Sequence, residues 1–193
     1  MRIPLQFRPC KAEQGLSLIE LMIAMVILAV GLSSLTILFM YATASNARNN
    51  KDTSATLLAK TVLEQISAQH PNSSAPILLT DCAGNQFTIA TAGGAAPNGV
   101  GATLLQDSAS FQYGGIDQTQ SYSAVPNGYA MVYTDCGTNG KQITYDVRWN
   151  VMTISANTTR LITVSARQSG ITNTQLGGRF FAIPVSLRGI GGP

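Results

Sequence analysis

Hydrophobic and polar positions follow three different patterns along this chain. From Leu21 to Ala42 the residues are uncharged and mostly apolar, and no proline interrupts the run. As an α-helix this run would extend roughly 33 Å, which is enough to cross the hydrocarbon core of a membrane. The first pattern therefore predicts a membrane-spanning helix.

The second pattern begins where the uncharged run ends. Apolar residues recur there three or four positions apart, at Ala55, Leu58, Val62 and Ile66. This spacing places them on one face of a helix, and the charged residues of the segment fall largely off that face. We expect the helix to continue in amphipathic form to about Gln69 and to end before Pro71, because a residue that precedes proline disfavours the helical conformation.

Beyond Pro71 the period changes to two. Residues 141–154 alternate apolar with polar side chains, which predicts a half-buried strand with Trp149 among its core residues. Such an aromatic residue could also belong to a carbohydrate-binding row, but the core is the more frequent place for it. Further strands are expected at Ile77–Thr80, Gln86–Thr91, Ser110–Tyr113, Tyr129–Asp135, Arg160–Arg167 and Phe180–Leu187. Pro184 should confine the last of these to a sheet edge or a bulge.

Two glycine-rich stretches interrupt this strand pattern. Residues 93–103 combine Gly, Ala and Asn and are expected to form a loop. Residues 189–193, with the sequence GIGGP, are expected to form a flexible tail rather than a phosphate-binding loop, because no strand-to-helix context surrounds them.

Composition and charge narrow the class of protein. Only 11% of the residues are charged, so the surface must be polar but largely uncharged, which suits an exported protein. The net charge is +3, and the first 15 residues account for most of it, leaving 9 basic and 8 acidic residues in the remainder. No basic run interleaved with aromatic residues follows, so nucleic-acid binding is not favoured.

The chain contains three cysteines and a single histidine. Cys10 lies in the basic N-terminal segment, so Cys82 and Cys136 form an even pair beyond it. In an oxidising compartment they could form a disulfide that stabilises the fold by about 2–4 kcal/mol, although two buried free thiols remain the alternative. A metal site is disfavoured because His70 has no ligand pattern near it.

The presence of the acidic residue Glu20 at the start of the apolar segment requires an explanation. A carboxylate at the start of an apolar membrane segment costs about 2.5–3.5 kcal/mol or more unless it is paired. If the chain were cut after Gly15, Leu16 would carry a free α-amine about one helical turn before Glu20. The amine of one subunit could then neutralise Glu20 of a neighbour within a bundle of packed helices.

The run Gly15-Leu16-Ser17-Leu18-Ile19-Glu20, followed by the uncharged helix, resembles the class III signal of type IV pilins and type II secretion pseudopilins. In that family a membrane peptidase cuts after the glycine and the new N-terminus is methylated. The resemblance implies that prepilin peptidase cleaves between Gly15 and Leu16, that Leu16 is N-methylated, and that Glu20 is the assembly glutamate. It covers about the first 70 residues.

The resemblance also implies a fold and a domain organisation. The fold class would be α+β and pilin-like, with a long N-terminal α-helix, half transmembrane and half amphipathic, packed on an antiparallel β-sheet head. The expected parts are a cleaved basic leader at 1–15, a transmembrane assembly helix at 16–42, an amphipathic continuation at 43–70, and a β-rich exported head at 71–193.

The sequence departs from the family pattern at two places. Leu16 stands where the family commonly has phenylalanine, which bears on cleavage. No proline bends the middle of the membrane segment, and this second departure favours a minor over a major pilin. The run Ile27 to Leu32 is most similar to PilV-like minor pilins. The resemblance then implies a structural minor pilin of a type IV pilus, acting in a priming or tip complex. A minor pseudopilin of a type II secretion system and a tip-displayed adhesin or DNA-uptake module are the alternatives.

The implied partners are prepilin peptidase, other minor and major pilins, an inner-membrane assembly platform, and membrane lipid before assembly. The implied location is a single pass through the inner membrane with the head in the periplasm, and later the cell-surface pilus. No cofactor is expected. No enzymatic activity is expected either, because the sequence lacks a nucleophile, metal-ligand or paired-carboxylate pattern.

Overall fold

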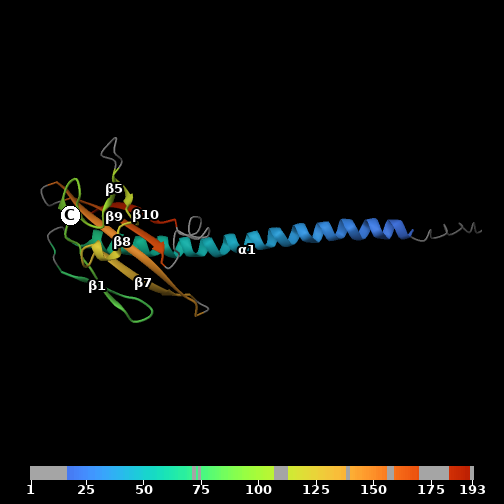
Figure 1. Cartoon of the computed structure of the whole chain (residues 1–193). Helices are drawn as coiled ribbons and strands as arrows, with labels where there is room; N and C mark the ends of the chain where they lie inside the picture. The colour runs from blue at the N-terminus through green and yellow to red at the C-terminus, as the bar shows by residue number, and fades with distance from the viewer. Residues whose placement is uncertain are drawn as a thin grey trace, which may run out of the picture. The chain divides into compact units, whose positions relative to one another are not determined.

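The computed structural model describes residues 17–70, 73, 75–106, 113–137, 140–155, 159–169 and 183–191. Within these ranges the chain forms one long helix, α1, a short 3-10 helix, η1, and strands β1 to β10 (Figure 1). The chain divides into two compact units, residues 1–46 and residues 47–193. The second unit contains all the strands and the C-terminal part of α1.

Helix α1 spans Leu18–Ala68. Its start is set by Ser17, whose hydroxyl oxygen accepts a hydrogen bond of 3.3 Å from the backbone N–H of Glu20. Serine before the helix and glutamate three residues later is a sequence arrangement that favours helix initiation. The helix ends one residue before the predicted Gln69.

The strands are short at first and long in the second half of the chain. Their bounds are β1 Ile77–Thr80, β2 Gln86–Ile89, β3 Gly94–Ala95, β4 Val100–Gly101, β5 Leu104–Gln106, β6 Tyr113–Ile116, β7 Ala130–Cys136, β8 Gln142–Ser155, β9 Thr159–Gln168 and β10 Val185–Gly191, with η1 at Tyr122–Ala124. β1 pairs with β2 and β5 with β6 as separate two-stranded sheets. The pattern predicted from the sequence is confirmed for β1, β2, β7, β8 and β9 with small changes at the ends.

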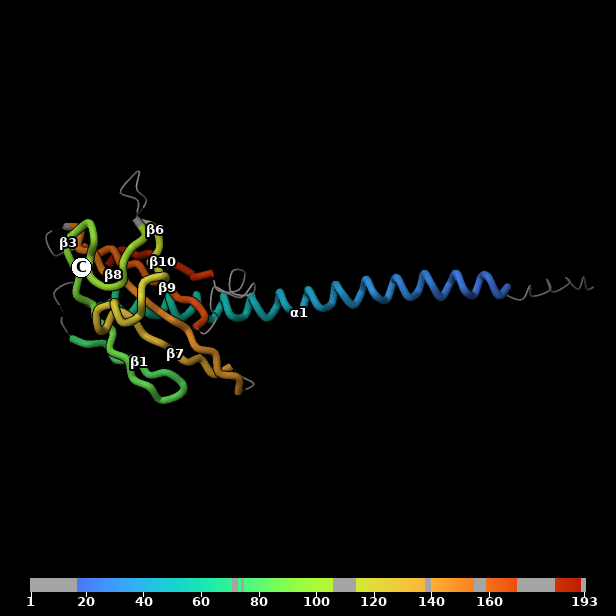
Figure 2. The backbone as a smooth tube through the Cα atoms, in the orientation of Figure 1, coloured from blue at the N-terminus to red at the C-terminus, as the bar shows by residue number. Residues whose placement is uncertain are grey.

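The central sheet is built around β8 (Figure 2). β9 pairs along one edge of β8, and β10 pairs with the far edge of β9. The other edge of β8 is shared, because β7 pairs with its first half and β3 and β4 pair with its second half. All these pairings are antiparallel except the short one between β3 and β8.

One face of this sheet packs on the C-terminal part of α1. The helix contributes the apolar residues Ala55, Leu58, Ala59, Val62 and Ile66, all buried. The facing side chains of β8 and β9 are also buried, with Trp149 paired to Val164 and Val147 to Ala166 across the two strands. The indole N–H of Trp149 donates to the Ala90 carbonyl at 2.9 Å, so Trp149 is a core residue as predicted.

The opposite face of β8 is also buried, which the sequence analysis did not anticipate. Asp146, Arg148 and Asn150 point to this side and are each at most 6% exposed. The guanidinium of Arg148 donates two hydrogen bonds to the Asp146 carboxylate, at 2.9 and 2.7 Å, and one to the Gln120 carbonyl at 2.6 Å. The strand itself is confirmed, but its expected half-burial is wrong, since residues 145–152 are buried on both faces. The segment between β4 and β7 provides the Gln120 carbonyl that satisfies Arg148 on the second face.

The predicted loop at residues 93–103 contains β3 and β4. Its glycines allow the backbone to approach β8 closely, since a Cβ on Gly101, whose φ is +120°, would lie 2.2 Å from the Trp149 carbonyl oxygen. The Asn150 amide also donates to the carbonyls of Asn98 and Ala102. The loop prediction therefore holds outside the two short strands, and the glycines serve there to let the backbone approach β8 closely.

The predicted C-terminal tail is also wrong for residues 189–191, which belong to β10. Gly189 lies against Leu63 of α1, with a Cβ position only 3.0 Å from that side chain. Pro184 precedes the strand, and β10 pairs only with β9 in the described part of the chain, as an edge strand should. The predictions for residues 1–15, Leu16, Pro71, 110–112, 180–182 and 192–193 lie outside the described residues.

Candidate functional site

The N-terminal part of α1 differs from every other segment of the structure in its exposure. Large apolar side chains from Leu18 to Tyr41 are all at least 50% exposed within the molecule. The helix contains a window of mean hydropathy 2.5, and by length and composition it could cross a membrane. A helix that is apolar all round needs an apolar environment, which is lipid or other helices.

The serine and threonine hydroxyls within this apolar segment are bonded to the helix itself. Ser33 and Ser34 both donate to the Val30 carbonyl, at 2.8 and 3.0 Å, and Thr36 donates to the Leu32 carbonyl at 2.9 Å. These bonds satisfy the three serine and threonine hydroxyl donors within the helix itself. These three side chains therefore meet the main requirement for burial in lipid, that polar groups be satisfied internally.

Glu20 lies in the first turn of α1. The positive end of the helix dipole favours a carboxylate at this place, and the Glu20 side chain is exposed like its neighbours. Gly15 and Leu16, the predicted cleavage and methylation positions, lie outside the described residues. The geometry of the proposed cut and of its partner amine therefore stays a prediction.

Residues 10–36 match the family model described as the prokaryotic N-terminal methylation motif. The chain carries a type IV pilin-like N-terminal signal. The match spans the end of the basic segment, the Gly15–Leu16 junction and the first part of α1, and it implies processing by prepilin peptidase. Comparison with curated proteins and with solved structures finds no match.

The fold agrees with the pilin-like signal. A long N-terminal helix packs through its C-terminal part on an antiparallel-rich sheet, which is the α+β architecture predicted from the sequence. Pilin-like proteins are generally structural rather than catalytic. In the described ranges, no group of three or more His, Cys, Asp or Glu residues is placed to hold a metal ion.

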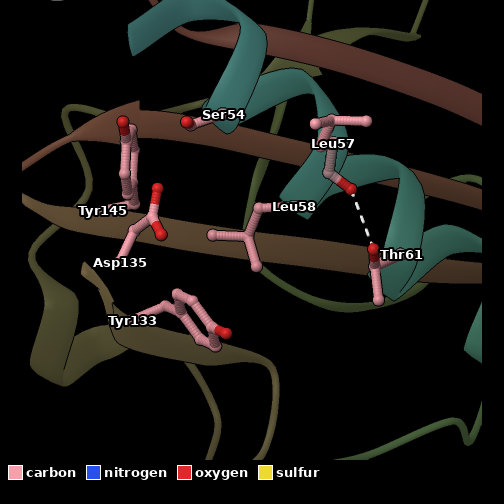
Figure 3. Close-up of a pocket in the computed structure, with 7 residues that line it drawn as sticks. All are labelled: Ser54, Leu57, Leu58, Thr61, Tyr133, Asp135 and Tyr145. Atoms are coloured by element: carbon pink, nitrogen blue, oxygen red, sulfur yellow. Dashed lines mark hydrogen bonds between the residues drawn. The ribbon is translucent and has the colours of Figure 1, made fainter. Parts of the chain in front are cut away.

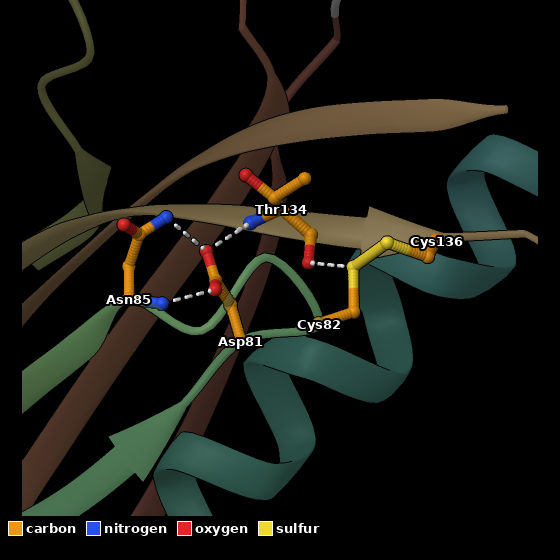
Figure 4. Close-up of a disulfide and its surroundings, with 5 residues drawn as sticks. All are labelled: Asp81, Cys82, Asn85, Thr134 and Cys136. Atoms are coloured by element: carbon orange, nitrogen blue, oxygen red, sulfur yellow. Dashed lines mark hydrogen bonds between the residues drawn. A yellow bond between two sulfur atoms is a disulfide. The ribbon is translucent and has the colours of Figure 1, made fainter. Parts of the chain in front are cut away.

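In the unit that contains the strands, a disulfide and a set of hydrogen bonds connect the β1–β2 hairpin to β7 (Figure 4). Cys82 and Cys136 form a disulfide with a Cα–Cα distance of 5.9 Å, as predicted. Beside it, the Asp81 carboxylate accepts hydrogen bonds from the backbone and side chain of Asn85, at 2.7 and 2.9 Å, and from the Thr134 N–H at 3.3 Å. The disulfide excludes the alternative that Cys82 and Cys136 are two buried free thiols.

Arg160 is the residue of structural importance that the sequence analysis missed. It is 1% exposed, and its guanidinium donates to the carbonyls of Thr91, Ile66 and Gln69. Two of these carbonyls belong to the C-terminal end of α1, where unpaired carbonyls and the helix dipole favour a cation. Burial lowers the pKa of Arg160 from its usual value. The arginine thus fastens the end of the helix to the sheet.

Proposed function

We propose that this chain is a PilV-like minor pilin that takes part in type IV pilus assembly, in a priming or tip complex. The observation that carries the proposal is the methylation motif at residues 10–36 running directly into a helix whose apolar side chains are exposed on all sides. Such a helix has to be covered by something outside its own fold.

The proposed processing divides the chain into four parts. Residues 1–15 form the leader that is removed, and residues 16–42 form the membrane and assembly helix. Residues 43–70 continue that helix against the head, and residues 71–193 complete the exported head. Before assembly the chain crosses the inner membrane once, with its head in the periplasm, and it later joins the cell-surface pilus.

Glu20 has a specific part in the proposed assembly. Cleavage after Gly15 leaves a methylated amine on Leu16, four residues before Glu20. A positive amine and a carboxylate that enter an apolar bundle together cost far less than either would alone. Pairing between neighbouring subunits would therefore select the incoming partner and set its axial position among other minor and major pilins on the assembly platform.

Replacing Glu20 with Ala tests the proposal directly. We expect the variant to be cut after Gly15 and N-methylated on Leu16 like the wild-type chain, yet to be lost from sheared filament fractions by at least about tenfold, since an unpaired amine would enter the apolar bundle. Mass spectrometry of the mature protein and immunoblotting of the fractions are the measurements. Glu64→Gln is the control, because Glu64 is an exposed carboxylate paired with Lys60.

Two results would contradict the proposal separately. An N-terminus other than Leu16 in the wild-type chain would remove the processing scheme. Normal incorporation of the Glu20→Ala variant would remove the pairing role and leave the cut intact. The same signal also serves minor pseudopilins of type II secretion systems, and a deletion that stops secretion of folded enzymes while surface pili persist would favour that function.

A further inference from the structure

A groove separates the C-terminal part of α1 from strands β7 and β8 (Figure 3). The helix side is formed by Ser54, Leu57, Leu58 and Thr61, and the sheet side by Tyr133, Asp135 and Tyr145. Its volume is about 220 Å³. Pockets for small molecules usually occupy about 300–1,000 Å³, so a groove of this size suits a single side chain better than a whole ligand.

Asp135 provides the acidic side chain of this groove. In the part of the chain that the structure describes, its carboxylate has neither a hydrogen bond nor an ion pair, unlike the other acids of the head that lie near it. Asp52, also close to the groove, faces Arg48 at 3.6 Å. Asp135 is therefore the carboxylate whose charge is available to a partner.

The surroundings of Asp135 favour a cation with an apolar stem. Burial raises the pKa of Tyr133 and of Tyr145, and the charge of Asp135 raises both further, which places negative potential at the two rings. Tyrosine rings attract cations through their faces, and Tyr133 is the ring within reach of a partner, because it is partly exposed whereas Tyr145 is 1% exposed. Leu57, which is 59% exposed, provides an aliphatic surface on the helix side.

We propose that this groove receives an arginine side chain from a neighbouring subunit. The planar guanidinium matches the Asp135 carboxylate in a forked arrangement and can stack on an aromatic ring, while its three methylene groups cover Leu57 and Leu58. Charge complementarity is the basis of the assignment. The identity of the partner as a filament subunit rests on the proposed function, whereas the chemistry of the groove does not.

The chemistry is tested on the full chain in detergent micelles with N-acetyl-arginine amide as the probe. We expect millimolar probe to shift the backbone amide NMR signals of Thr61, Tyr133 and Asp135, with N-acetyl-citrulline amide as the uncharged isostere. Asp135→Asn should weaken binding of the arginine probe by about two- to fivefold, in line with the loss of one exposed ion pair. Glu64→Gln, an acid-to-amide change outside the groove, should leave it unchanged.

Equal responses to the arginine and citrulline probes, or an unchanged affinity in Asp135→Asn, would overturn the proposal. A photo-reactive residue at Leu57 then tests the source of the side chain in living cells. Cross-linked peptides that contain arginine, and that are lost in Asp135→Asn, support a subunit partner; cross-links that persist in that variant overturn it. Because the NMR test requires no filament, its failure is distinguishable from failure of the proposed assembly function.

Discussion

The two parts of helix α1 place their apolar side chains in opposite environments. From Leu18 to Tyr41 these side chains are at least 50% exposed, whereas Ala55, Leu58, Ala59, Val62 and Ile66 are at most 9% exposed. The helix is continuous, so the difference is not one of backbone conformation. It shows that the second part is stabilised by its own head, while the first part depends on partners that the chain itself does not supply.

The comparison predicts which changes destabilise the isolated protein. Changes on the buried part of α1, or where the helix is held to the sheet, should lower the free energy of unfolding of the head. Changes in the exposed part should act only in the membrane or in the filament. Trp149 is the only tryptophan and is fully buried, so its fluorescence reports unfolding of the head in full-length protein kept in detergent.

The largest effect is expected at the point where α1 ends against the sheet. Arg160→Ala removes the donor to three backbone carbonyls and should lower the free energy of unfolding by about 3–5 kcal/mol, because the carbonyls of Thr91 and Gln69 lose their charged donor while Ile66 keeps only the bond from the Gln69 N–H. Urea unfolding followed by Trp149 fluorescence measures it. Arg167→Ala is the control, since that side chain is 27% exposed and should cost about 1 kcal/mol. Equal losses in the two variants would contradict the anchoring role.

The same truncation placed in each part of α1 gives a sharper test. Val62→Ala removes two buried methyl groups from a side chain with no exposed surface, and should cost about 2 kcal/mol. Val26→Ala, at 63% exposure, should change head stability by no more than about 0.5 kcal/mol. The measurement is the same urea unfolding. A similar loss in both variants would mean that the exposed part of the helix also contributes to the stability of the head.

Hydrophobic periodicity predicted the helix and strands of the head well where the burial of one face against the core sets the spacing of the apolar residues. The alternation around Trp149 gave β8, and the spacing of Val62 and Ile66 gave the buried face of α1. Periodicity did not predict the burial of Asp146 and Arg148. Alternation assigns residues to the two faces of a strand, but it does not show which segment of the chain covers each face. Their burial depends on a segment far away in the sequence, which presents the Gln120 carbonyl to Arg148.

The functional residues also fall into two groups, those that a local sequence motif could predict and those that it could not. The signal around Gly15 and Glu20 is local, so the sequence alone could suggest it and the match to the methylation motif supports the signal as a whole. The roles of Gly15, Leu16 and Glu20 themselves remain predictions. Arg160 binds the Ile66 carbonyl, and Asp135 lines the same groove as Leu57, so both sites combine residues more than fifty positions apart and no local pattern marks either one.

The smallest of the expected effects concerns Asp81, which fastens the β1–β2 hairpin to β7. Burial by itself raises the pKa of this carboxyl, but the hydrogen bonds donated by Asn85 and Thr134 outweigh burial, so the pKa falls below its usual value. A group whose pKa is lower in the folded state stabilises the fold above the unfolded-state pKa, near 4, and loses that contribution as the pH falls through the folded pKa.

Asp81→Asn should therefore lower the thermal unfolding temperature of the head at pH 7 and should reduce its further decrease between pH 5 and pH 2. Thermal unfolding of the oxidised protein across this pH range, again followed by Trp149 fluorescence, provides the measurement. With the disulfide intact the loss should be smaller than that of Val62→Ala, because Cys82–Cys136 still holds the hairpin to β7. A pH profile parallel to that of the wild-type chain would mean that Asp81 does not fasten the hairpin through its charge.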